Sequence, residues 1–136
     1  MVEEFVTAGR VRFVYRHYAF LGRESVRAAE AAECAAEQGR FWEYHDTLFS
    51  NWGGENRGAF SDDRLKRFAA ALGLDREKFN SCLDSGRYSY RVGADNRDAQ
   101  VTGVRGTPTV FVNNTQVGNP LDYSQLRRAI LAALPR

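Results

Sequence analysis

The chain has 136 residues, of which 43% are hydrophobic and 26% charged, and its formal net charge is +2 at pH 7. This is the length of one domain that can bury a core. Basic residues are interleaved with acidic ones, which excludes the clustered basic surface of a nucleic-acid-binding protein. No apolar run approaches the roughly 20 residues of a membrane-spanning helix, so we expect no membrane segment.

The first residues are acidic and lead directly into a strand-like segment. Residues 1–6 read Met-Val-Glu-Glu-Phe-Val, which is unlike the basic and then apolar start of a secretory signal. Taken as written, the chain is expected to stay in the cytoplasm, where it is made.

The first third predicts a helix end, a strand and a helix. Residues 2–8 are typical of the last turns of a helix that stops at Gly9. In residues 11–17, Val11, Phe13 and Tyr15 alternate with other side chains, which predicts a strand. An Ala-rich helix is predicted from about residue 24 to residue 38.

Four more helices are predicted over residues 40–51, 61–72, 75–85 and 87–102. Ser61 is the predicted N-cap residue of the helix at 61–72, and the helix at 75–85 starts at Asp75. The helix at 40–51 has the strongest pattern, a wide apolar stripe. It consists of Phe41, Tyr44, His45, Leu48, Phe49 and Trp52.

The last third predicts a hairpin and a helix. Residues 106–108, Gly-Thr-Pro, lead into a β-branched and aromatic strand at 109–112. Asn113 and Asn114 suit a two-residue turn because Asn tolerates positive φ angles. Residues 115–117 form the expected return strand, and Asp122 is placed to cap the final helix.

Four features in this order carry a family resemblance: the strand at 10–17, the segment 39–46, the Gly-Thr-Pro loop and the strand after it. Together they resemble the bacterial DsbA-like thiol-disulfide oxidoreductases. The resemblance implies an α/β thioredoxin-like fold with a helical insertion. Residues 1–23 and 87–136 correspond to the thioredoxin-like core and residues 24–86 to the insertion.

The family's Cys-x-x-Cys motif is missing from this sequence. The strand that leads to the motif and the start of the first helix are missing too, because Met1 falls in the second half of that helix. We therefore expect an N-terminally truncated, redox-inactive form of a family that acts on protein or peptide thiols and disulfides outside the cytoplasm. The alternative is a non-catalytic thioredoxin-like module for peptide binding or association.

Cys34 and Cys82 are the only cysteines, and each falls on the apolar face of a predicted helix. Three interpretations remain open. The favoured one is a structural disulfide within the insertion, since the related proteins work where disulfides persist. The others are two buried, inert thiols and a redox-active pair, which no neighbouring residue supports.

The two histidines, His17 and His45, are interpreted as core residues with satisfied hydrogen bonds. Neither has companions at metal-ligand spacing, so no metal site and no cofactor is expected.

The resemblance assigns a role to Gly106, Thr107 and Pro108. In the family this loop contains a cis-proline, and its backbone receives an extended substrate peptide by strand-like pairing. We therefore expect a cis Thr107–Pro108 bond and a peptide-binding loop.

In the family the missing strand lies between the strands that match residues 11–17 and 109–112. Without it, two apolar edges lack backbone partners, and open edges invite association. We expect a homodimer, with or without exchanged segments, that buries one of these edges.

Overall fold

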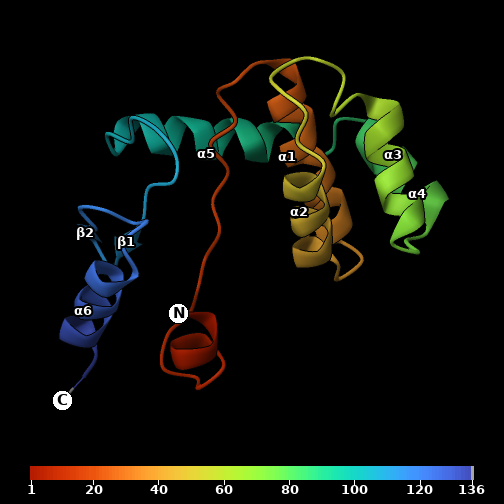
Figure 1. The fold of residues 1–136 in the computed structure, drawn as a ribbon. Coiled ribbons are helices and arrows are strands. Elements are labelled where there is room, and N and C mark those ends of the chain that lie inside the picture. The colour runs from red at the N-terminus through yellow and green to blue at the C-terminus, as the bar shows by residue number, and fades with distance from the viewer. Residues whose placement is uncertain (136) are drawn as a thin grey trace. The chain divides into compact units, whose positions relative to one another are not determined.

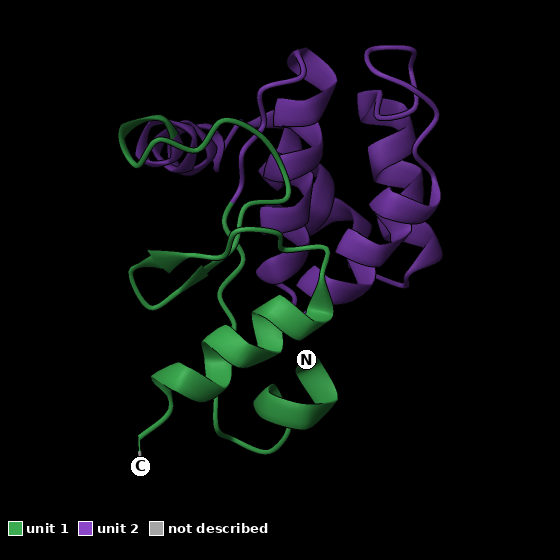
Figure 2. Ribbon diagram, turned by 60° about the vertical axis from the view of Figure 1, so that its left-hand side comes forward, with its two compact units in different colours: residues 1–16, 100–136 green, residues 17–99 purple. Residues whose placement is uncertain are grey.

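The computed structural model describes residues 1–135. The chain forms two compact units, a helical unit of residues 17–99 and a smaller unit of residues 1–16 and 100–136 (Figure 2). The thioredoxin-like core predicted from the sequence also includes residues 17–23 and 87–99, and that division stays a prediction. In the structure both ranges lie in the helical unit because Val92 packs in one cluster with Ala19 and Ala29.

Five helices make up the helical unit, and Figure 1 labels them α1 to α5. The first, α1, packs against α2, α3 and α4, and α3 packs against α4. Small side chains on α1 allow this close approach. The helices are α1 (Arg23–Ala36), α2 (Phe41–Ser50), α3 (Asp62–Ala71), α4 (Arg76–Asp84) and α5 (Ser89–Val101), which continues into the smaller unit.

The predicted capping residues begin two of these helices. The Ser61 hydroxyl accepts the Arg64 N–H at the start of α3, and the Asp75 carboxylate accepts the Lys78 N–H at the start of α4. These bonds satisfy amide groups that have no partner inside the helix. Gly39, with φ of +71°, follows α1 in a conformation that favours glycine.

A buried hydrogen bond joins α2 to α3 in the core of the helical unit. The Tyr44 hydroxyl on α2 donates to the Leu65 carbonyl on α3 at 2.9 Å. Burial raises the pKa of Tyr44 far above its usual value. The larger core cluster is drawn from α1 to α4 and Leu74, and its largest fully buried side chains are Tyr44, Phe79, Leu65, Leu83, Cys34 and Cys82.

The predicted apolar stripe on α2 is too wide. Tyr44 and Leu48 are buried, but Phe49 is 70% and Trp52 64% exposed. The contacts of α2 within its unit are with α1 and α3, and these helices cover only part of its circumference. The period of the stripe is helical, as predicted, but its outer half lies on the surface.

The connection from His17 to α1 is held by side chains. The Asp95 carboxylate accepts the His17 N–H at 3.0 Å. The amide of Asn96 bonds to both the N–H and the C=O of Ala19, at 2.8 and 3.0 Å. Asn56 donates to the Leu21 carbonyl at 2.9 Å. Side chains thus bond to the backbone at residues 17, 19 and 21, in the way that a neighbouring strand does in a sheet.

The smaller unit contains a helical turn, η1 (Val2–Val6), the strands β1 (Phe111–Val112) and β2 (Thr115–Gln116), and helix α6 (Tyr123–Ala133), which packs against β1. The strands pair antiparallel with Phe111 opposite Gln116. The turn between them has Asn113 at φ of +53°.

The core of the smaller unit is short of large buried side chains. Its buried hydrophobic residues are Phe5, Val117 and Ile130. A polar cluster joins η1 to α6: Glu4 accepts hydrogen bonds from the Tyr123 hydroxyl and from Arg127. The bond from Tyr123, followed by that from Arg127, lowers the pKa of Glu4.

The predicted strand at residues 11–17 is wrong as a sheet element. Within residues 1–135 there is one sheet, formed by β1 and β2, and residues 11–17 lie outside it. Alternating side chains suit an extended chain, but a strand also requires a neighbouring backbone with which to form a hydrogen-bonded ladder.

Among the helices of residues 1–135, none combines the length and the apolar character that crossing a bilayer requires.

Candidate functional site

The Gly-Thr-Pro loop lies in the smaller unit, directly before β1. The Thr107–Pro108 peptide bond is cis. Thr107 and Pro108 are exposed, and the Thr109 hydroxyl donates to the Gly106 carbonyl at 2.7 Å. This bond closes the loop on itself, so Gly106, Thr107 and Pro108 stand together at the surface as one short turn.

The outer edge of β1 continues this loop. The Val117 N–H donates to the Val110 carbonyl at 2.9 Å, which makes these two residues a hydrogen-bonded pair. In an antiparallel ladder such pairs alternate with non-bonded ones, so the N–H and C=O of Phe111 point away from β2. Within residues 1–135 no backbone group bonds to them. Phe111 is 37% exposed, and the edge is open to an extended peptide.

The loop and the edge offer binding groups rather than reactive ones. From Gly106 to Val112 the side chains are apolar or carry a threonine hydroxyl, and none ionises near neutral pH. The arrangement can pair with another backbone and fix its direction. It supplies no nucleophile for disulfide exchange, which requires a thiolate.

The two cysteines form a disulfide in the helical unit, as the favoured interpretation predicted. Cys34 on α1 and Cys82 on α4 are joined, with their Cα atoms 5.9 Å apart. Each residue is only 1% exposed. Because no thiol can approach the bridge without opening the core, the disulfide holds two helices together and does not face substrate.

Buried polar contacts surround His17. Its ring Nε2 lies 2.8 Å from a Glu33 carboxylate oxygen, and the Arg91 guanidinium lies 3.4 Å from the same oxygen. His17 is therefore a core residue with a satisfied hydrogen bond, as predicted. His45 is less buried, and its Nδ1 lies 3.0 Å from Asp46 on the helix surface. Across residues 1–135, no three His, Cys, Asp or Glu side chains are grouped to hold a metal ion.

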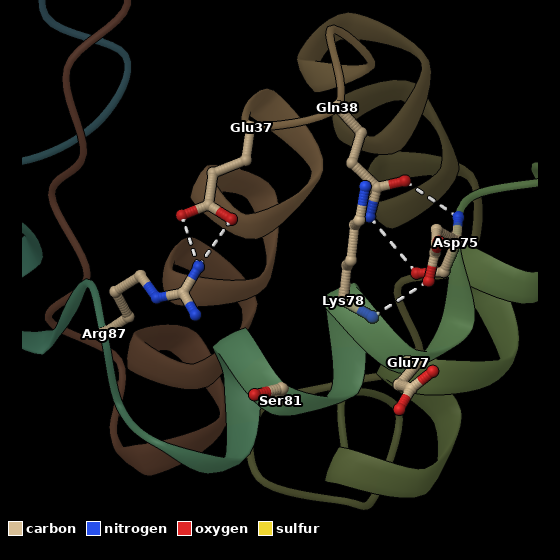
Figure 3. Close-up of a pocket in the computed structure, with 7 residues that line it drawn as sticks. All are labelled: Glu37, Gln38, Asp75, Glu77, Lys78, Ser81 and Arg87. Carbon is tan, nitrogen blue, oxygen red and sulfur yellow. Dashed lines mark hydrogen bonds and ion pairs between the residues drawn. The ribbon is translucent and has the colours of Figure 1, made fainter.

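A surface groove of about 700 Å³ lies between the end of α1 and the start of α4 (Figure 3). Several of its lining groups bond to neighbouring residues. Glu37 accepts bonds from Arg87 at 2.8 Å and from the Tyr88 hydroxyl at 2.7 Å. The bond from Arg87 is the main reason that the pKa of Glu37 is lowered. Gln38 bonds to both backbone groups of Asp75. These bonds join the residues that follow α1 to the starts of α4 and α5.

Two features of the structure were not predicted from the sequence. One is the outward direction of the Phe111 backbone, which depends on the register of the hairpin. The other is the exposure of Phe49 and Trp52, which the spacing alone assigned to the core. Glu33 was missed as well, although a carboxylate within an Ala-rich buried helix signals a polar partner such as His17.

Comparison with known proteins identifies the class. The family model described as Thioredoxin matches residues 1–132, so the chain belongs to the thioredoxin family. Within that family it is DsbA-like, which confirms the fold class predicted from the sequence.

Two solved structures support this placement. BdbD from Bacillus subtilis, in its oxidised form, superposes with a TM-score of 0.86 and 25% identity, over 96% of this chain and 72% of that one. The thiol-disulfide exchange protein alpha-DsbA2 from Wolbachia pipientis gives a TM-score of 0.78 over 96% of this chain and 70% of that one. Its identity of 21% shows a shared fold.

One relative in sequence is named as an antiporter and not as an oxidoreductase. The chain is 39% identical over 125 residues to a protein named Na(+)/H(+) antiporter NhaA 3 from Salinispora tropica. The match covers 90% of this chain but only 18% of the antiporter. The chain therefore corresponds to less than a fifth of that much longer relative.

Proposed function

We propose that the chain is a redox-inactive member of a family that forms or exchanges disulfides in protein substrates, and that its loop of Gly106, Thr107 and Pro108 binds a peptide. The 136 residues by themselves are redox-inactive. The burial of the Cys34–Cys82 disulfide carries this proposal, since each cysteine is 1% exposed. Exchange needs an accessible sulfur, and the sequence has no Cys-x-x-Cys to provide one.

The rate at which dithiothreitol reduces insulin tests whether the chain is redox-inactive. We expect the purified chain to leave the rate at the level of dithiothreitol alone. A double Cys34→Ala, Cys82→Ala variant should give the same rate. Turnover by the unmodified chain that disappears in this variant would overturn the proposal.

Peptide binding at the loop is supported by the geometry of the outer edge of β1. The backbone groups of Phe111 point outward, and a peptide laid along the edge would pair with them as an added strand. Side-chain contacts would come from Thr107, Pro108 and Phe111, which are all exposed. Affinity then comes mainly from the backbone, so one site accepts many sequences.

We also propose a homodimer that buries either residues 11–17 or this edge of β1, and in the second case the partner copy and a peptide compete for the edge. Residues 109–112 carry no charge and no proline, and such unprotected edges tend to pair with another chain. Light scattering at micromolar concentration should give twice the monomer mass. Phe111→Lys, which adds a charge to the edge, should give the monomer mass, and a monomer at all concentrations in the unchanged protein would refute the dimer.

The disulfide supports a location in an oxidising compartment, because such bonds are rare where glutathione keeps thiols reduced. We propose that the protein functions outside the cytoplasm. Thiol labelling of the protein in cells would find no free cysteine if this is right, and two free cysteines if it is wrong.

The second candidate is a non-catalytic association module. It is favoured by the match to a protein named as an antiporter, of which the chain covers 18%. In this role the chain would bind a larger membrane protein and perform no exchange. Co-purification with an antiporter, at equal yield after Phe111→Lys, would favour this candidate over binding at the loop.

A further inference from the structure

A single charged residue lies on the stretch of chain that contains the candidate peptide-binding loop and the hairpin. Residues 100–121 include Arg105 and no other Lys, Arg, Asp or Glu. Arg105 directly precedes Gly106, and its side chain is exposed. Within residues 1–135 no carboxylate forms an ion pair with it. The guanidinium therefore keeps its N–H donors for a group outside the chain.

The rest of the smaller unit carries an excess of positive charge as well. Its three acidic residues are Glu3, Glu4 and Asp122. Glu4 already accepts bonds from Tyr123 and Arg127, and Asp122 caps α6. In the helical unit the balance is reversed, with 12 basic and 14 acidic residues. The described part of the smaller unit has six arginines, which are Arg10, Arg12, Arg16, Arg105, Arg127 and Arg128.

A peptide on the outer edge of β1 would reach Arg105 by way of the loop. The edge is open at the backbone of Phe111, and residues 106–110 connect it to Arg105 without a charged side chain. Because the loop and the edge are uncharged, the Arg105 guanidinium is the group there that distinguishes an anionic peptide side chain from a neutral one. Arginine presents its donors in a planar fork that fits a carboxylate.

We propose that Arg105 gives the peptide site a preference for segments that carry Asp or Glu where the peptide crosses the loop. The inference rests on the proposed peptide binding at the loop and concerns the choice among peptides. Pairing with the backbone of Phe111 supplies affinity with little regard to sequence, and the ion pair with Arg105 ranks the sequences. The same positive charge disfavours a peptide with Lys or Arg at that place.

Titration of the isotope-labelled protein with three matched peptides tests the preference. Each is a short peptide of Ser, Thr and Val, with Glu, Gln or Lys one residue from each end, so that either direction of the added strand brings one of them to the loop. Amide signals from Gly106 to Val112 report binding. We expect the Glu peptide to bind about threefold to fivefold more tightly than the Gln peptide, the range of an exposed ion pair. The Lys peptide should bind more weakly, and added salt should reduce these differences.

Three variants test the residue. Arg105→Gln should remove the difference in affinity between the Glu and the Gln peptide. Arg105→Lys keeps the charge and should retain part of the difference. The matched control is Arg128→Gln, which removes the same charge from an exposed position on α6 of the same unit and should keep the preference. Unchanged amide signals away from each substitution show that the variant is folded.

The possible results separate the preference from peptide binding itself. Equal affinity of the unchanged protein for the Glu and the Gln peptide would overturn the preference and leave peptide binding in place. An equal loss of preference in Arg128→Gln and Arg105→Gln would assign it to the net charge of the unit and not to Arg105. If no peptide shifts the signals from Gly106 to Val112, peptide binding at the loop is wrong. Shifts with phosphatidylglycerol vesicles alone would indicate an anionic lipid surface instead.

Discussion

The helical unit and the smaller unit are stabilised by different means. The helical unit has a continuous core drawn from four helices, with a disulfide inside it. The smaller unit has Phe5, Val117 and Ile130 as its buried hydrophobic residues and a two-strand ribbon whose outer edge is open. The difference indicates a division of labour, in which the helical unit supplies stability and the smaller unit supplies a backbone edge for binding.

Removing the disulfide should give the largest effect, a loss of stability in the helical unit. Cys34→Ala with Cys82→Ala frees a loop with a sequence separation of 48, and the chain-entropy model gives a loss of about 4 kcal/mol. Urea unfolding followed by tryptophan fluorescence measures it, because both tryptophans lie in the helical unit. Ser81→Ala, an exposed change beside the bridge, is the control. An unchanged urea midpoint in the double variant would contradict a structural role for the bridge.

Tyr44→Phe should have a smaller effect in the same core. The change removes the hydroxyl that bonds to the Leu65 carbonyl at 2.9 Å and leaves that acceptor unsatisfied. We expect unfolding to become easier by about 1–2 kcal/mol. Tyr90→Phe, at an exposed site, should leave the urea midpoint where it is. Equal midpoints for Tyr44→Phe and Tyr90→Phe would show that the bond does not stabilise the core.

The local features of the helical unit could be read from the sequence more fully than those of the smaller unit. Ser61 and Asp75 cap helices as predicted, because capping depends on residues only three positions apart. The loop at Thr107–Pro108 and the turn at Asn113 are local as well. Residues 11–17 failed as a strand because pairing depends on a distant backbone, and the side-chain pattern does not specify one.

The exposure of Phe49 and Trp52 could not be predicted for a related reason. The spacing of apolar residues gives the period of a helix, but the share of its surface that neighbours cover depends on tertiary packing. The open edge at Phe111 likewise depends on whether another backbone lies beside β1, and the local turn signal at Asn113 and Asn114 does not specify that neighbour.

The smallest expected effect is a pH dependence confined to the smaller unit. The bonds from Tyr123 and then Arg127 lower the pKa of Glu4 from its ordinary 4.5. A lowered folded pKa stabilises the folded state above pH 4.5, and this contribution is lost as the pH falls through the folded value. NMR titration of the Glu4 carboxyl carbon should give a midpoint below 4.5, which Tyr123→Phe should move upward. A midpoint that Tyr123→Phe leaves unchanged would exclude this cause.

NMR mapping of a bound peptide tests the division of labour most directly. The probe is S-carboxymethylated insulin B chain, an unfolded peptide without thiols, added to the isotope-labelled protein. We expect amide signals from Gly106 to Val112 to shift, with Phe111 among the largest shifts, while those around Cys34 and Cys82 stay in place. Shifts centred on the helices that carry the disulfide, with none along β1, would contradict it.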